Sequence, residues 1–249
     1  MVHYDTFDYQ KFWQGREYED LSERLALKKL IPENKVSKKL IEIGCGFGRV
    51  ATFYQPFFRK CTLVDPSTHL LKQAKDNLKD LINIDYIRAS AHKIPVADNS
   101  YDYCLMVRVC HHLTDLEPAI QEIKRILKPE GYLILEYANK INFKAKIRSY
   151  LRGEFDFSQN IYPVDLRSSR KRNDNYIDFC SHHPYQVEKI LKRNGFLIEK
   201  SLSVSNFRNP LTKRFIPLRL LLKLEDLTQG ILAKIYFGPS IFLLCRKIS

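Results

Sequence analysis

The eleven-residue segment KLIEIGCGFGR, which begins at Lys39, constrains the fold of this 249-residue chain more than any other. Its first half is a continuous apolar run too short for an amphipathic helix, so it predicts a strand buried on both faces. Its second half has glycine at every other position, at Gly44, Gly46 and Gly48. Without a Cβ atom the backbone can approach a ligand closely, and a helix expected to begin near residues 47–50 would point its N-terminal N–H groups at that ligand. The segment therefore predicts a nucleotide-type site.

The kind of nucleotide depends on the residue that follows the glycines. A dinucleotide fingerprint, G-x-G-x-x-G, needs glycine where this chain has Arg49, whose side chain would obstruct close packing of the helix on the strand. What remains is an acidic residue inside the strand, Glu42, followed by the alternating glycines. This pattern resembles motif I of the class I S-adenosylmethionine-dependent methyltransferases. The resemblance implies that Glu42, Gly44, Cys45 and Gly46 contact S-adenosylmethionine.

A second short apolar strand, residues 60–65, ends in Asp65 and is followed by Pro66. In an open parallel sheet, ligands bind beyond the carboxyl ends of the strands, where a carboxylate can accept hydrogen bonds from both ribose hydroxyls. We therefore predict that Asp65 and Pro66 lie at the cofactor. The alternative is that Asp65 only caps a helix expected over residues 67–81, since aspartate is a favoured N-cap residue.

The chain after the third predicted strand, residues 84–89, also resembles this family. The family has an Asp-Ala pair here that meets the adenine, and this chain has Ser90 and Ala91, followed by His92. The resemblance implies that Ala91 and His92 contact the cofactor. Because Ser90 replaces the usual aspartate, the resemblance implies no strong hydrogen bond from that side chain to the adenine.

The segment after the fourth predicted strand, residues 103–107, runs from Arg108 to Leu113 and resembles the family's x-x-L-H-H-L. We expect the backbone of Arg108, rather than its guanidinium, to face the cationic methyl donor. His111 could act as a general base, because imidazole titrates near neutral pH. The alternative is that His111 and His112 only hydrogen-bond the loop. The string EIKRILKPEGYLILE that follows resembles the family's next helix, turn and strand.

These matches predict one α/β domain over residues 1–249. We expect a Rossmann-like, doubly wound sheet of seven mostly parallel strands, with the last strand antiparallel and with C-terminal insertions. The core is expected at 36–137, 183–204 and 240–249, and the insertions at 138–182 and 205–239. We expect residues 138–182, with a basic run at 167–172, to be irregular, and both insertions to form a mobile lid that selects the acceptor.

Two amphipathic or aromatic segments have open interpretations. The N-terminal aromatics could close over a ligand or could cap the sheet; they are Phe7, Tyr9, Phe12, Trp13 and Tyr18. A helix is expected to start at Asp20 or Ser22. Residues 210–237 are basic and amphipathic, and either pack on their own sheet, which is the simpler interpretation, or contact a membrane or an apolar substrate.

Charge and cysteine content limit the classes of partner and metal site that we expect for this chain. Residues 138–249 carry 21 Lys and Arg against 9 Asp and Glu, whereas residues 1–137 carry 20 against 19. A basic surface can recruit RNA, anionic lipid or an acidic small molecule. The chain has no C-x-x-C pair, so we expect no metal site. The N-terminus lacks the pattern of a signal peptide, so we expect a cytoplasmic protein.

The predicted function is methyl transfer from S-adenosylmethionine to a small-molecule or lipid-like acceptor, with peripheral membrane contact as an option. One alternative is an RNA methyltransferase, which only the charge favours, because the chain has no recognisable RNA-binding motif. Another is a non-catalytic protein that binds S-adenosylmethionine. The sequence does not name the acceptor atom or the oligomeric state.

Overall fold

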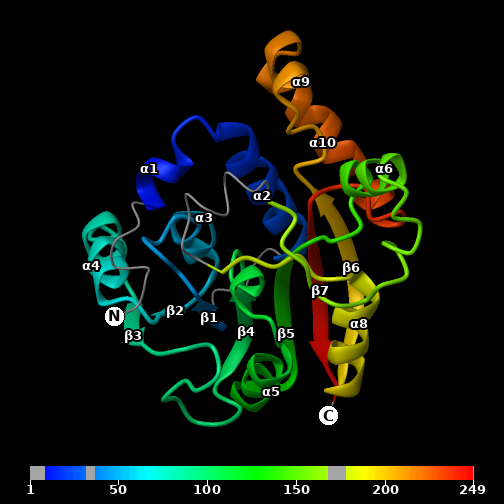
Figure 1. The fold of residues 1–249 in the computed structure, drawn as a ribbon. Helices are drawn as coiled ribbons and strands as arrows, with labels where there is room; N and C mark the ends of the chain where they lie inside the picture. Colours follow the sequence, from blue (N-terminus) through cyan, green and yellow to red (C-terminus); the bar gives the residue numbers. More distant parts are fainter. Residues whose placement is uncertain (1–8, 32–36, 168–177, 249) are drawn as a thin grey trace.

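A computed structural model describes residues 9–31, 37–167 and 178–248 of the chain. Within them, one seven-stranded sheet has the order β3-β2-β1-β4-β5-β7-β6, which Figure 1 shows from left to right. The strands are β1 (Lys39–Ile43), β2 (Lys60–Asp65), β3 (Ile84–Arg88), β4 (Tyr101–Met106), β5 (Leu127–Ala138), β6 (Phe196–Val204) and β7 (Ser240–Lys247). All neighbouring strands pair in parallel except β7, which is antiparallel to β5 and β6. The predicted fold class is confirmed.

Helices cover both faces of this sheet. They are α1 (Tyr9–Trp13), α2 (Glu17–Leu30), α3 (Ala51–Tyr54), α4 (Thr68–Asn77), α5 (Glu117–Ile126), α6 (Phe143–Leu151), α8 (Pro184–Arg193), α9 (Pro210–Phe215) and α10 (Leu218–Ala233), with short 3₁₀ turns η2 (Gln55–Phe57) and η3 (Cys110–His112). Successive side chains of a strand point to opposite faces. Leu40 of β1 therefore packs with α2 and α3, and Ile41 with α5 and α8. The central strands are apolar on both faces, as the sequence predicted.

Two predicted helix starts are wrong. The first long helix begins at Glu17 rather than at Asp20 or Ser22, and Ser22 lies inside it, where its hydroxyl donates to the Tyr18 carbonyl. The helix expected at residues 47–50 begins only at Ala51, because the preceding turn contains Gly48 at φ +79°, which a right-handed helix does not allow.

The expectation that residues 138–182 are irregular is wrong for Phe143–Leu151, which form α6. Asn142 caps α6 by accepting a hydrogen bond from the Ala145 N–H at 3.1 Å. Isolated bridges join residue 139 to 182 and residue 164 to 181. The end of the segment therefore pairs with its beginning next to β5. Most of the predicted basic run, residues 168–172, lies outside the described residues.

The amphipathic segment over residues 210–237 forms α9 and α10. Helix α10 packs on α2 and β6, so one of its faces does cover the chain's own sheet. In Figure 1, α9 and α10 project above the sheet, with α6 beside the lower end of α10.

Candidate active site

One cavity of about 1400 Å³ lies at the carboxyl ends of the parallel strands β1, β2, β4 and β5. All ten site residues predicted from the sequence line this cavity. They are Glu42, Gly44, Cys45, Gly46, Asp65, Pro66, Ala91, His92, Arg108 and His111. They come from four separate segments, which the parallel sheet brings to one edge. Their individual roles stay proposals.

The three glycines of the loop have different structural reasons. Gly44 has φ +71°, and a Cβ atom there would overlap Cγ2 of Val109. At Gly48 a Cβ atom would lie 2.7 Å from Cδ1 of Leu78, so this glycine allows the loop to pack against α4. A Cβ atom at Gly46, in contrast, would meet no protein atom within 4 Å. Gly46 therefore leaves its space to the cavity, as a close-fitting ligand would require.

The carboxylate of Asp65 is fixed at the end of β2. It is 5% exposed, and its two oxygens accept hydrogen bonds from the N–H groups of Gly46 and Ser67, both at 2.9 Å. The Ser67 side chain caps α4 by accepting from the Leu70 N–H at 3.1 Å. The alternative that Asp65 is the N-cap of this helix is therefore wrong. Asp65 instead couples the glycine loop to the end of the neighbouring strand.

The carboxylate of Glu23, in α2, holds two arginines beside the cavity. It is fully buried, and Arg49 and Arg108 each pair with one of its oxygens. The backbone of Arg108 has φ +62°, and its N–H donates to Glu136 at 2.8 Å. Burial lowers the pKa of Arg108, but the carboxylates of Glu23 and Glu136 outweigh burial and raise it. The guanidinium is thus held against α2 with its charge compensated.

Glu42, the acidic residue of the first motif, lies inside the sheet at the cavity wall. Its carboxylate accepts a hydrogen bond from the Tyr54 hydroxyl. Burial raises the pKa of Glu42 to about 7, although that hydrogen bond and the charge of Arg49 act in the opposite direction. Burial also raises the pKa of the Cys45 thiol. Cys45 is therefore protonated at neutral pH and is not suited to act as a nucleophile.

His111 follows β4 in η3 and is 8% exposed. Its ring lies 4.0 Å from the ring of His112 and 4.6 Å from that of Phe179, measured between centroids. The Nδ1 atom of His111 has no hydrogen-bond partner among the described residues, whereas Nδ1 of His112 lies 3.0 Å from the Asp178 carbonyl. Burial, with the neighbouring His112, lowers the pKa of His111 well below its usual value. The imidazole is therefore neutral at pH 7.

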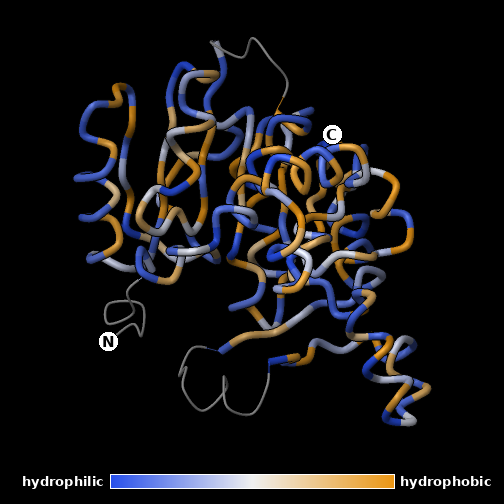
Figure 2. The backbone as a smooth tube through the Cα atoms, turned by 90° about the horizontal axis from the view of Figure 1, so that it is seen from above, coloured by the Kyte–Doolittle hydropathy of each residue, from blue (hydrophilic) through white to orange (hydrophobic). Residues whose placement is uncertain are grey.

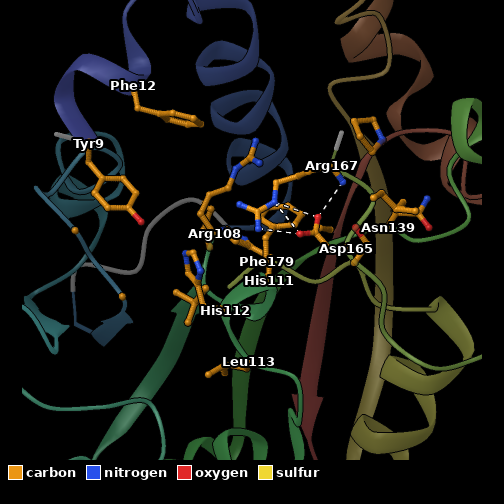
Figure 3. Close-up of a pocket in the computed structure, with 18 of the residues that line it drawn as sticks. Tyr9, Phe12, Arg108, His111, His112, Leu113, Asn139, Asp165, Arg167 and Phe179 are labelled. Atoms are coloured by element: carbon orange, nitrogen blue, oxygen red, sulfur yellow. Dashed lines mark hydrogen bonds and ion pairs between the residues drawn. The ribbon is translucent and has the colours of Figure 1, made fainter. Parts of the chain in front are cut away.

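The N-terminal aromatics divide between cavity and core. Tyr9, Phe12 and Trp13 of α1 line the cavity, and Figure 3 shows the first two pointing from α1 toward the side chain of Arg108. The Arg49 guanidinium lies over the Trp13 ring, with its Cζ atom 3.7 Å from the ring centroid. Tyr18 is buried in α2 and belongs to the core. Tyr18 therefore packs in the core, whereas closure of Tyr9, Phe12 and Trp13 over a ligand stays a prediction, and Phe7 lies outside the described residues.

A second wall of the cavity was not predicted from the sequence. Lys144, Arg148 and Arg152 recur every four residues along α6 and its end, and all three line the cavity. Their side chains are exposed, and no ion pair to an acidic residue is formed by any of them within the described part of the chain. Asp165 and Arg167 also line the cavity, and Figure 3 shows the ion pair between them. The spacing of the three basic residues was the available signal for this helix.

Among the described residues, no group of three or more His, Cys, Asp or Glu side chains is arranged to hold a metal ion. The six cysteines are all buried and unpaired.

Comparison with known proteins agrees with the geometry of the cavity. A family model described as a methyltransferase domain matches residues 41–135. The chain is 29% identical over 168 residues to a demethylmenaquinone methyltransferase of Thermotoga maritima, with 64% of this chain and 70% of that protein covered. The crystal structure of an S-adenosylmethionine-dependent methyltransferase from Mesorhizobium loti superposes with a TM-score of 0.63 at 16% identity, covering 91% of this chain and 98% of that one. Residues 41–135 thus match a methyltransferase domain, and the chain has the fold of the class I S-adenosylmethionine-dependent methyltransferases.

The matched relatives cover different shares of this chain, and the chain covers different shares of them. This chain is 27% identical to an uncharacterised methyltransferase of Bacillus subtilis over 115 residues, which are 46% of that protein. The chain spans about half the length of several other curated relatives that it matches. No helix in the described segments combines the length and the apolar character that crossing a bilayer requires.

The residues that line the cavity fit S-adenosylmethionine. The open space beside Gly46 admits the cofactor close to the backbone, and the fixed carboxylate of Asp65 is suited to accept hydrogen bonds from a ribose. Near the sulfonium a free cation would be unfavourable, and the charge of Arg108 is compensated by Glu23. The space beside Gly46, the carboxylate of Asp65 and the compensated charge of Arg108 thus agree with the cofactor that this family uses.

Proposed function

We propose that this protein transfers a methyl group from S-adenosylmethionine to a small-molecule or lipid-like acceptor that carries an acidic group. The observation that carries this proposal is that one cavity joins the cofactor residues at the ends of β1 and β2 to the basic face of α6. The cofactor, when bound, supplies an electrophilic methyl group on its sulfonium.

In the cofactor half of the cavity, Asp65 would accept hydrogen bonds from the ribose hydroxyls, and Ala91 and His92 would line the adenine pocket. Tyr9 and Phe12 would cover the ligand from α1 and exclude water. These positions agree with the order of the motifs in the family.

In the acceptor half, Lys144, Arg148 and Arg152 would bind the acidic group and orient the acceptor. Apolar side chains share this wall, among them Phe157 and Phe179, so the acceptor would also have an apolar part. The name of the Thermotoga maritima relative refers to demethylmenaquinone. A lipid-like acceptor of this kind would match the apolar side chains of the wall, whereas the basic side chains are the reason to propose an acidic group on the acceptor.

His111 would receive or orient the acceptor proton at Nδ1, which has no partner among the described residues. Its low pKa keeps the imidazole neutral, but it also makes the imidazole a weak base. Holding the acceptor in near-attack geometry can contribute about 7–11 kcal/mol, so positioning outweighs proton transfer. His111→Ala is then expected to lower turnover while leaving cofactor affinity unchanged.

The cofactor half is tested by calorimetry with S-adenosylhomocysteine. Each charge-assisted hydrogen bond is worth about 1.5–3 kcal/mol, so Asp65→Ala should weaken affinity by at least about tenfold. Asp85→Ala, an exposed carboxylate paired with Lys60, is the matched control and should bind normally. Equal affinity of the Asp65 variant and the wild type, or tighter binding of NAD than of S-adenosylhomocysteine, would contradict the proposed site.

The acceptor half is tested with methyl-labelled cofactor and a cell extract separated into lipid, small-molecule and RNA fractions. We expect label in the lipid or small-molecule fraction. Arg148→Glu with Arg152→Glu should abolish it and preserve binding of S-adenosylhomocysteine. Lys146→Glu, a residue of α6 that does not line the cavity, is the control. Label in RNA alone, or no label despite cofactor binding, would support the two alternative functions instead.

A further inference from the structure

Helix α10 has an unusual distribution of polar and apolar residues. Its inward face carries Glu225 and Gln229, both fully buried. Glu225 accepts hydrogen bonds from the Tyr18 hydroxyl at 2.6 Å and from the Ser205 N–H at 2.7 Å, and Gln229 donates to the Ser22 carbonyl at 3.0 Å. Buried hydrogen bonds therefore connect α10 to α2 and to the residue that follows β6.

The outward face of α10 and the turn after it is apolar instead. It carries a single line of large side chains spaced by three or four residues, which we call the α10 stripe: Leu220 (49% exposed), Leu224 (36%), Leu227 (73%), Ile231 (66%) and Ile235 (58%). This spacing puts all five on one side of the helix. Figure 2 looks from above, the direction in which α9 and α10 project in Figure 1. A contiguous apolar surface of this kind marks an interaction site.

Basic side chains flank the α10 stripe. Arg214, Arg219, Lys223 and Lys234 are all exposed, and none of them pairs with an acidic side chain within the described residues. Asp226, an exposed acid on this helix, is paired with Lys29 of α2. The surface around the stripe is therefore positive.

We propose that the α10 stripe and its flanking cations dock this protein on an anionic lipid bilayer. A helix with an apolar face bordered by lysine and arginine binds in the interfacial region, where apolar burial and attraction to anionic headgroups act together. Pairing with a second copy is disfavoured by charge, because a two-fold interface would place the same uncompensated cations opposite one another. The charge pattern thus selects an anionic occupant.

The same surface continues toward the cavity. Phe143, the first residue of α6, stacks on Phe237 beyond α10 at 4.9 Å between ring centroids. The apolar side chains of α6 and its following turn are also exposed, and they are Phe143, Ile147, Tyr150, Leu151 and Phe155. Since the basic face of α6 lines the cavity, docking would bring a lipid-like acceptor to the acceptor wall. The docking proposal itself does not depend on the acceptor.

Vesicle co-sedimentation of the purified full chain tests this proposal. We expect binding to vesicles of equal parts phosphatidylcholine and phosphatidylglycerol, weaker binding to pure phosphatidylcholine, and loss of the difference at high salt. Arg219→Glu with Lys223→Glu should weaken binding at least about 25-fold, since each lost cation costs about fivefold and each new carboxylate adds repulsion. Lys72→Glu with Lys79→Glu, exposed on and after α4, is the matched control and should bind as the wild type does.

The apolar part is tested by Leu227→Glu with Ile231→Glu. The control is Ile82→Glu, since Ile82 is as exposed as Leu227, at 73%, but lies far from α10 next to β3. Unchanged binding of S-adenosylhomocysteine would show that the variants are folded. Loss of vesicle binding in the stripe variant alone supports the proposal. Failure of the wild type to bind anionic vesicles overturns it, as does a wild-type dimer that the stripe variant converts to a monomer.

Discussion

Replacing Glu42 by glutamine should make the stability of this protein less dependent on pH. The carboxyl group has a pKa of about 7 in the folded chain, against a usual value of 4.5. Below pH 4.5 it is protonated in both the folded and unfolded states, so burial carries no charge penalty. Between about pH 4.5 and 7 the unfolded state ionises this group while the folded state keeps it protonated, so stability falls as the pH rises, and the loss is complete above pH 7. At 1.36 kcal/mol per pKa unit the loss is about 3 kcal/mol.

The variant Glu42→Gln cannot ionise, and its amide oxygen can still accept the hydrogen bond from Tyr54. Urea unfolding of both proteins at pH 5 and at pH 8 measures the effect. Relative to the wild type, the variant should gain up to about 3 kcal/mol between the two pH values. Any cost of burying the amide N–H groups is the same at both and cancels. Glu17→Gln, on the exposed part of α2, is the control. An equal stability difference at pH 5 and pH 8 would refute the argument.

Two further substitutions test the ion pairs of Glu23 and the close packing at Gly44. Glu23→Gln removes one partner of a buried ion-pair network, so the free energy of unfolding should fall by about 3–5 kcal/mol in urea titrations, and a change below 1 kcal/mol would be inconsistent with that network. Gly44→Ala should lower affinity for S-adenosylhomocysteine by more than about tenfold, because the new methyl group overlaps Val109. The control is Gly15→Ala, which has the same φ of +71° but lies in open space and so tests backbone strain without the overlap. Equal losses of affinity in the two variants would rule out the overlap as the cause.

The sequence by itself determined the fold class and the location of the cofactor residues. Buried parallel strands read as continuous apolar runs, and each run here ends in a residue that must face the same sheet edge, such as Gly44 or Asp65. These signals are local, because a glycine or a carboxylate after a strand has the same meaning wherever the chain goes next.

The tertiary structure decided what no local pattern contains. Only the fold shows that Glu23 of α2 compensates Arg108, which lies 85 positions away in the sequence, and that Asp65 holds the glycine loop rather than capping α4. The amphipathic pattern of α10 could be read from the sequence, but its orientation could not. Periodicity gives two faces, and the buried hydrogen bonds of Glu225 placed the polar face inward, which leaves the α10 stripe exposed.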